Sequence, residues 1–468
     1  TLLFIAIFVL NSFVFHNVFV GVVLLVAYLV NYGFSLGSVG APQEKTVMKW
    51  WVGTVALLSI IMVIGSIAYY VAAVPAEVFQ VLVLLTPLIV TLAEKKFGKS
   101  LGLVQKFFRQ FHDLWHEKKH KLTQPFFILS AGALVMMMLI LEALQTSQIL
   151  DSVRSPWERI DVSVILLFFL ATTLVFTLLY RGRERAMTMP LFIFLLFLFL
   201  SVVAIVFPIG YGFDSFIHQA TEAHLAEFGT ISPKPFYYIG QYALVLFAHH
   251  SFSIPLDFAD TFLVSLLAAV LLPFAWFSAA AHTTKKPRTA MFTLVGLFLL
   301  PLTSFIVTTP QGLANLWILL GILMTVPFLL EHQDPPKWLF CLIGLSTLLI
   351  HPIAGIPLII YFALFFLHTT KDKTSLKRLL FWGIVTVASV ILPLSFISNA
   401  LISGQELGIN FSNLHPAVLF ESLNLSIFFE NKFSPLLDLV YLYGRNLLLI
   451  VFLISAWTLY IYRKELSD

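Results

Sequence analysis

The sequence predicts an all-α, polytopic membrane protein with about 13 transmembrane spans, and three observations support this fold class. Hydrophobic residues make up 59% of the 468 residues and charged residues only 11%, which is more apolar surface than a soluble domain can bury. The apolar residues form runs long enough for membrane helices, which need roughly 20 residues to cross a bilayer. The charged residues collect between these runs. The expected spans are 2–30, 50–72, 77–93, 126–148, 161–180, 187–208, 260–282, 289–308, 311–330, 337–350, 352–368, 379–399 and 434–462.

Short loops rich in Lys and Arg favour the cytoplasmic side of a membrane, and they set the expected orientation. These basic loops can all be cytoplasmic only if residues 209–259 begin and end on the same side of the membrane. This segment is therefore expected on the outer face. Within it, the apolar run 237–248 is too short to cross comfortably, and we expect an interfacial helix there. The basic loops lie at 95–121, 181–185, 285–288, 371–378 and 463–464.

Three regions are expected along the chain. Residues 1–186 form an N-terminal transmembrane bundle that includes a basic amphipathic helix at 94–122 on the cytoplasmic surface. Residues 187–400 form a transmembrane core, and residues 401–468 form an outer loop and a final span. The single cysteine, Cys341, allows no intramolecular disulfide. The chain does not begin with Met, which leaves open that it begins inside a longer gene product.

The polar stretch after the sixth span holds the strongest candidate site. Asp214, His218 and Glu222 follow one another at i, i+4 and i+8, so a helix would place them on one face. Pro233 and Pro235 bracket Lys234 and keep it out of a helix. A carboxylate at the end of an apolar helix can act as a general base, and a lysine can hold a phosphate as a point charge.

Structural roles are the alternatives for the same side chains. Asp214 is well suited to cap an interfacial helix, Lys234 to extend its amine towards the membrane surface, and His218 to be a polar surface residue. Tyr237 and Tyr238 suit a membrane interface or a stacked ring equally. Other residues expected on the outer face could complete a site; they are His249, His250, Asp257, Asp260 and His351.

The order of these motifs resembles the GT-C class of polytopic glycosyltransferases, in particular the branch of protein O-mannosyltransferases and lipid A aminoarabinose transferases. In that branch an Asp follows the first core span, and a Lys-Pro-Pro-Leu-Tyr-Tyr-like segment precedes the second. Here Asp214 and the run Lys234-Pro235-Phe236-Tyr237-Tyr238 occupy these places. The segments TTPQGLANL (308–316) and LLIHPIAG (348–355) resemble two further turns of the family. The resemblance covers about 187–400.

The resemblance implies an inverting transferase that uses a polyprenyl-phosphate-linked sugar at the outer face of a prokaryotic cell membrane. Asp214 would deprotonate the acceptor hydroxyl, and Lys234 would bind the phosphate of the donor. Residues expected to contact substrate are His218, Glu222, Tyr237, Tyr238 and His351. The acceptor, whether protein, lipid or glycan, stays open. No metal ligand is assigned, and a divalent metal stays open as a cofactor.

Two other classes of protein remain as alternatives. A polytopic transporter or flippase would show inverted repeats, broken helices at the membrane midplane and ionisable residues deep within spans. A non-catalytic membrane scaffold subunit would need none of these features. Membrane lipid is an expected partner in every case, and a nucleic acid in none.

Overall fold

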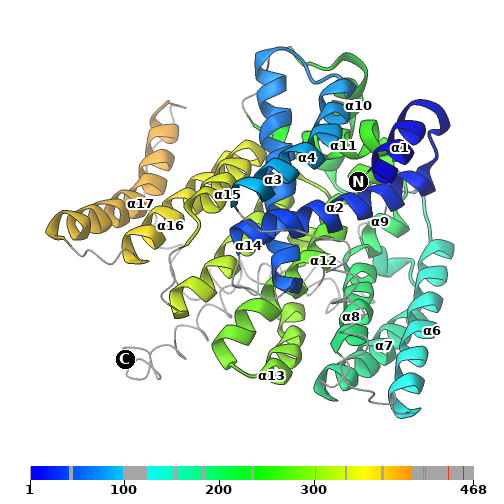
Figure 1. Ribbon diagram of the computed structural model, residues 1–468. Coiled ribbons are helices and arrows are strands. Elements are labelled where there is room, and N and C mark those ends of the chain that lie inside the picture. The colour runs from blue at the N-terminus through cyan, green and yellow to red at the C-terminus, as the bar shows by residue number, and fades with distance from the viewer. Residues whose placement is uncertain are drawn as a thin grey trace.

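The computed structural model describes residues 2–41, 46–97 and 124–402, apart from 152, 154, 182–184, 233, 235, 236, 301, 332–334 and 370–373, and also residues 415, 417, 441 and 457. All the regular elements in these ranges are helices, as the sequence predicts, and they form a bundle of differently inclined rods (Figure 1). The helices are α1 (Leu2–Leu10), α2 (Val18–Gly40), α3 (Thr46–Val71), α4 (Ala76–Phe97), α6 (Gln124–Thr146), α7 (Val162–Arg181), α8 (Arg185–Leu200), α9 (Val202–Val206), α10 (Phe213–Phe228), α11 (Ile239–Phe252), α12 (Leu256–Thr284), α13 (Pro287–Phe292), α14 (Pro310–Glu331), α15 (Lys337–Ile350), α16 (Pro352–Thr369) and α17 (Ser375–Ile402).

Several helices are long and apolar enough to cross a membrane, so the chain has the character of an integral membrane protein. Within the described residues there are seven by length and composition, namely α2, α3, α6, α7, α12, α14 and α16. The expected number of about 13 spans is therefore not confirmed. The expected basic helix at 94–122 and the expected span at 434–462 lie almost entirely outside the described residues.

The long first run of the sequence is a tight pair of helices. After α1, one turn of π-helix (Asn11–Phe15) leads to His16 in a left-handed conformation with φ of 48°. The Asn17 side chain then accepts a hydrogen bond from the Val20 amide at 3.0 Å and caps α2. The polar pair His16–Asn17 thus ends one helix and begins the next.

Two of the expected spans are interrupted. The run 187–208 breaks between α8 and α9, where the Tyr441 hydroxyl accepts a hydrogen bond from the Val203 amide and donates one to the Leu200 carbonyl. The Tyr441 hydroxyl thus forms hydrogen bonds with backbone groups that would have no partner in lipid. The run 289–308 is not one α-helix either, because α13 gives way to 3₁₀ turns at Thr293–Leu299 and Leu302–Phe305. Pro301 lies between these turns and has no amide proton to donate to a continuous helix.

Helix α11 departs most from the sequence expectation. It was expected to lie at the membrane interface, but every residue from Ile239 to Phe247 is buried, and the helix packs against α2, α3, α4, α12 and α15. A helix that is apolar on all sides is stable only when it is covered on all sides. The interfacial assignment for 237–248 is therefore wrong. Through α11 and α12, the expected N-terminal region and the expected core share one interior; the division at residue 186 stays a prediction.

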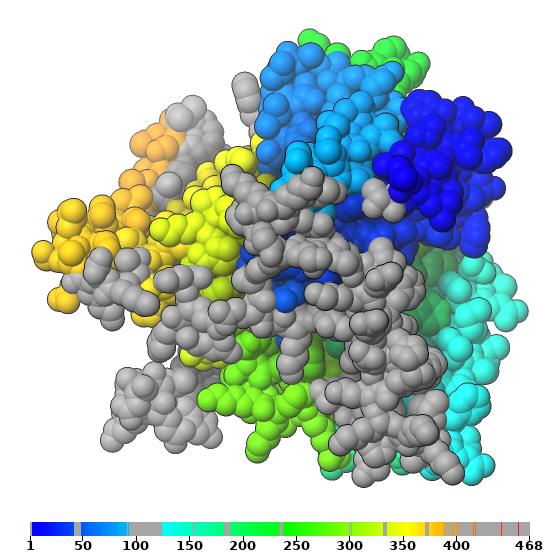
Figure 2. All heavy atoms as spheres, viewed as in Figure 1, coloured from blue at the N-terminus to red at the C-terminus, as the bar shows by residue number. Residues whose placement is uncertain are grey.

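The bundle has two distinct ends. Arg288 of α13 donates a hydrogen bond to the Tyr180 carbonyl at the end of α7, so two basic loops that the sequence assigns to one side do lie together. The opposite end carries α10 and the turn between α3 and α4, where the Val74 amide donates to the Gly229 carbonyl at 2.8 Å (Figure 1). Green atoms of the segment around α10 reach the surface there, beside the blue atoms of α3 and α4 (Figure 2).

Helices α2 and α3 approach each other through small residues. A Cβ atom added at Gly53 would overlap the backbone of Gly33 and Gly37, and one added at Gly37 would overlap the Lys49 carbonyl. Gly33 and Gly37 form the Gly-x-x-x-Gly spacing that lets membrane helices pack backbone to backbone.

We expect Gly53→Ala to destabilise the protein by about 1–3 kcal/mol, because the added methyl group forces α2 and α3 apart. The measurement is the thermal unfolding midpoint of purified protein in detergent. The matched control is Gly383→Ala in α17, where no described atom lies within 4 Å of the new Cβ. Equal midpoints for the two variants would show that the close approach is not needed.

Candidate functional site

Helix α10 carries three of the residues that the sequence singled out. Gly212 is its N-cap with φ of 79°, and Gly229 ends it in a left-handed conformation while its amide donates to the Leu225 carbonyl. Both positions suit glycine, which adopts positive φ without steric cost. Asp214 lies in the first turn, inside the helix. The alternative that Asp214 is the capping residue is therefore wrong, although its charge favours the helix N-terminus.

The carboxylate of Asp214 is exposed, whereas His218, one turn further, is buried against aromatic rings. The Nδ1 atom of His218 and the Tyr242 hydroxyl lie 2.7 Å apart and share a hydrogen bond. The His218 ring meets the Tyr238 ring edge to face at 5.2 Å, and Tyr238 in turn contacts His351 at 5.4 Å. Residues distant in the sequence thus form one cluster at the end of the bundle.

Tyr238 links the parts of this cluster through a constrained backbone. Its φ of 75° places a bulky residue in the left-handed region, which costs on the order of 1–3 kcal/mol. Its amide donates to the Ile350 carbonyl at 3.1 Å, and its ring packs against Tyr237 at 4.5 Å. Five of the seven predicted site residues therefore meet here: Asp214, His218, Tyr237, Tyr238 and His351.

Burial favours the neutral form of both histidines of the cluster. Burial lowers the pKa of His218; the charge of Asp214 opposes this shift, and the nearby His351 reinforces it. Burial also lowers the pKa of His351. A neutral imidazole carries one N–H donor and one free acceptor nitrogen. Next to an exposed carboxylate, these rings can donate to or accept from a bound hydroxyl.

Glu222 lies one turn deeper than His218 and belongs to a separate buried group. It is fully buried and accepts a hydrogen bond from the Gln241 side-chain amide at 3.1 Å. Burial raises the pKa of Glu222 well above its ordinary value, and the neighbouring carboxyl of Asp260 adds to the shift.

The carboxyl groups of Glu222 and Asp260 lie close enough to share a hydrogen bond when one of them is protonated, and the Gln219 side chain lies close to Asp260 as well. Among the described residues, Glu222 Oε2 and Asp260 Oδ1 otherwise have no donor. A proton held by one carboxyl supplies that donor and removes one of two buried negative charges, which would otherwise be costly.

Lys234 is placed differently from its sequence expectation. Its amine donates two hydrogen bonds of 2.8 Å, to the carbonyls of Tyr69 and Ala72 at the end of α3, and lies 5.4 Å from the centre of the Tyr69 ring. A cation at the C-terminus of a helix forms hydrogen bonds with the last carbonyls and interacts favourably with the negative end of the helix dipole. Among the described residues, all of its polar contacts are with α3, so Lys234 is not part of the Asp214 cluster.

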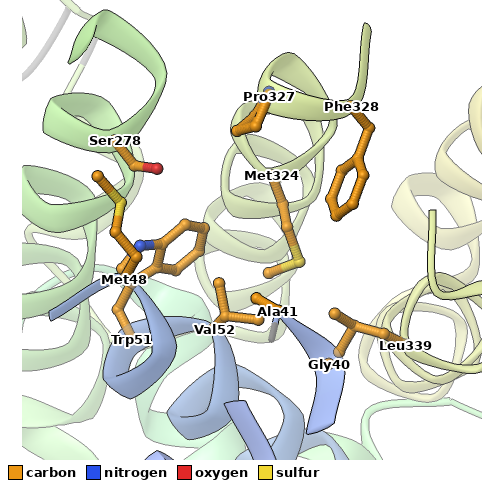
Figure 3. A pocket seen from close by; sticks show the side chains of 10 residues that line it. All are labelled: Gly40, Ala41, Met48, Trp51, Val52, Ser278, Met324, Pro327, Phe328 and Leu339. Atoms are coloured by element: carbon orange, nitrogen blue, oxygen red, sulfur yellow. The ribbon is translucent and has the colours of Figure 1, made fainter. Parts of the chain in front are cut away.

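A hollow of about 20 Å³ lies elsewhere in the bundle (Figure 3). Its walls come from the last two turns of α12 and α14, the ends of α2 and α3 that face each other, and the start of α15. The hollow therefore lies towards the end of the bundle that carries Arg288, here called the basic end. It has room for about one water molecule. Its lining residues are Gly40, Ala41, Met48, Trp51, Val52, Ser278, Met324, Pro327, Phe328 and Leu339.

The sequence singled out neither Gln241, which donates to Glu222, nor the contact of Tyr242 with His218, and it named Asp260 only among residues that could complete a site. A usable signal exists for each, because Gln241 and Tyr242 are polar groups in an otherwise apolar run and Asp260 lies at the start of a membrane span. Such groups need hydrogen-bond partners when buried. Among the described residues, no three His, Cys, Asp or Glu side chains are grouped to hold a metal ion.

The chain matches no family model, no curated protein and no solved structure. The expected membership of the GT-C class therefore stays a prediction that depends on the residues themselves.

The buried carboxyl pair makes stability depend on pH. Because the pKa of folded Glu222 is raised above its ordinary 4.5, the folded state keeps a proton that the unfolded state loses. Stability should therefore fall as pH rises from about 4.5 towards neutral. We expect Glu222→Gln, which keeps an N–H donor for Asp260, to weaken this dependence in thermal unfolding scans. Exposed Glu227 on the same helix provides the control, Glu227→Gln, which should leave the pH profile unchanged. A profile that is equally steep in Glu222→Gln would contradict the shared proton.

Replacing Lys234 tests its place at the end of α3. Lys234→Met keeps the aliphatic stem but leaves two carbonyls without donors, and we expect a loss of about 1 kcal/mol in thermal stability. Lys234→Arg should retain most of the wild-type stability, and Lys286→Met at the basic end serves as the control for loss of a charge. No loss in Lys234→Met would mean that the amine is free for another partner.

Proposed function

We propose that this chain is a membrane-embedded glycosyltransferase of the GT-C type, which moves a sugar from a polyprenyl-phosphate carrier to an acceptor hydroxyl. The observation that carries the proposal is the exposed carboxylate of Asp214 beside the cluster of His218, Tyr238 and His351. No hydrogen bond to this carboxylate is made by the described residues, so it is available to a substrate. The positive-inside rule, applied to the loops around Arg181 and Arg288, supports a site on the outer side of the membrane. The proposed membrane is that of a prokaryotic cell.

In this mechanism, Asp214 takes the proton of the acceptor hydroxyl while that oxygen attacks the anomeric carbon of the sugar. The bond between the anomeric carbon and the carrier phosphate breaks, and the phosphate leaves with the electron pair. Attack from the face opposite the leaving group inverts the configuration. Phosphate is a good leaving group, so a second carboxylate acting as an acid, which glycoside hydrolases need, is dispensable. Neutral His218 and His351, with Tyr237 and Tyr238, would orient the sugar through hydrogen bonds and ring contacts.

The donor phosphate needs a positive partner, and Lys234 is the residue that the resemblance assigns. An ammonium group has three N–H donors, and two of them already bind the end of α3. One N–H is thus available, which supports a weaker phosphate contact than a free lysine would make. Glu222 is proposed to act through the Asp260 and Gln241 contacts that hold α10 in place.

The transporter alternative draws support from one observation. The buried pair of Glu222 and Asp260 joins α10 to the start of the span α12, and buried ionisable groups in membrane proteins commonly mark proton or ion pathways. A transporter would depend on this pair, whereas a transferase would depend on Asp214.

Asp214→Asn separates these functions, because it preserves size and helix geometry while removing the base. With purified protein in vesicles that contain a polyprenyl-phosphate sugar, we expect transfer to fall about 10²–10⁴-fold, the usual contribution of a general base. Glu227→Gln on the same helix should leave transfer unchanged. Undiminished transfer in Asp214→Asn would exclude the assigned base, and solute flux that is lost in Glu222→Gln but kept in Asp214→Asn would favour transport.

A further inference from the structure

Helix α10 has its polar side chains inside and its apolar side chains outside. Ser215, His218 and Glu222 are 4%, 8% and 0% exposed. Phe213 and Phe216, on the opposite side, are 79% and 43% exposed. A helix on the surface of a water-soluble protein has the reverse arrangement.

The outward face of α10 is uniformly apolar only in the first half of the helix. At roughly 100° per residue, the outward direction is shared by Phe213, Phe216, Ile217 and Ala220, and then by His224, Glu227 and Phe228. The first two turns of this face are apolar throughout, whereas the last two carry the exposed polar residues His224 and Glu227. The outward face therefore changes along the helix axis from purely apolar to a mixture of polar side chains and Phe228.

Apolar side chains are also exposed just before α10 in the chain and at the start of the span α12. Ile209, just before α10, is 58% exposed, and Phe258 in the first turn of the span α12 is 55% exposed. Helices α10 and α12 pack against each other, and the carboxyl groups of Glu222 and Asp260 lie between them. Lipid is the solvent for the exposed apolar side chains of a span such as α12, and α10 lies directly against this span.

We propose that α10 is the interfacial helix of this protein, with its first two turns immersed at the boundary of the acyl chains and its last two turns among the headgroups and water. The sequence assigned that role to 237–248, which the structure buries as α11. Apolar residues on one face and a tilt from apolar to polar surroundings are the features by which a helix lies in a membrane surface.

This placement also sets the depth of the Asp214 carboxylate. Asp214 lies at roughly 100° from Phe213 around the helix, at the edge between the lipid-facing side and the buried polar side. It is then held at the boundary between the acyl chains and the headgroups, where the polar part of a lipid-linked molecule meets its acyl part. The lipid contact itself does not depend on the proposed transferase activity.

The single cysteine of the chain makes a direct test practical. In a Cys341→Ser background, a nitroxide label is attached at Phe216→Cys, Ala220→Cys or Glu227→Cys, and the full chain is reconstituted in phospholipid vesicles. Collision with oxygen reports the acyl region, and collision with a water-soluble nickel chelate reports the aqueous phase. The measured quantity is the ratio of collision with oxygen to collision with the chelate. This ratio should be several-fold higher for the labels at 216 and 220 than for the label at 227, which lies on the same face.

Each other outcome overturns the proposal. Chelate collision at 216 and 220 as frequent as at 227 would place the whole helix in water. Low collision with both reagents at 216 and 220 would mean that a protein surface, such as a second copy of the chain, covers this face. The label at 220 keeps the test valid if Phe216→Cys does not fold, because both positions share the apolar half of the helix.

Discussion

The burial of polar groups in α11 is the constraint on which the rest of this end of the molecule depends. Gln241 and Tyr242 lie in a helix that protein covers on all sides, and neither side chain can reach water there. A buried polar group that lacks a hydrogen bond costs about 1–3 kcal/mol. Each of the two therefore needs a partner from a neighbouring element, and α10 provides both, Glu222 for Gln241 and His218 for Tyr242.

This requirement explains why α10 turns its polar side inward and its apolar side outward. The two contacts fix the rotation of α10 about its axis, and the glycines at its ends allow the sharp turns that bring it over α11. The carboxyl of Glu222 then meets Asp260 at the start of α12, and Asp214 is left at the edge of the helix. At the same end of the bundle as α10, Lys234 binds the last carbonyls of α3. Stability and candidate chemistry thus share one set of hydrogen bonds.

Particular residues show how far sequence patterns reached. The spacing of Asp214, His218 and Glu222 predicted a common helical face, and the structure confirms that α10 is a helix with His218 and Glu222 turned inward together. The pair Pro233 and Pro235 kept Lys234 out of a helix but did not reveal its partner. The partner is the backbone of α3, more than 160 residues away in the chain, and backbone carbonyls have no sequence signature. The interfacial role expected for 237–248 was wrong. The run is too short to span a membrane, but it is apolar on nearly all sides, and that pattern indicates a buried helix.

The sequence by itself determined the solvent and the helical character of this protein. Its apolar content requires lipid, and in lipid each backbone amide and carbonyl must find its partner within a helix. It also determined that Asp214, His218 and Glu222 lie on one side of a helix, because helical spacing is a local property of the chain. Only the tertiary structure decided which side of α10 faces inward, which helix is buried whole, and that Glu222 is joined to Asp260 while Lys234 is joined to α3. These outcomes depend on contacts between segments far apart in the chain, where each polar group binds the donor or acceptor that packing brings within reach.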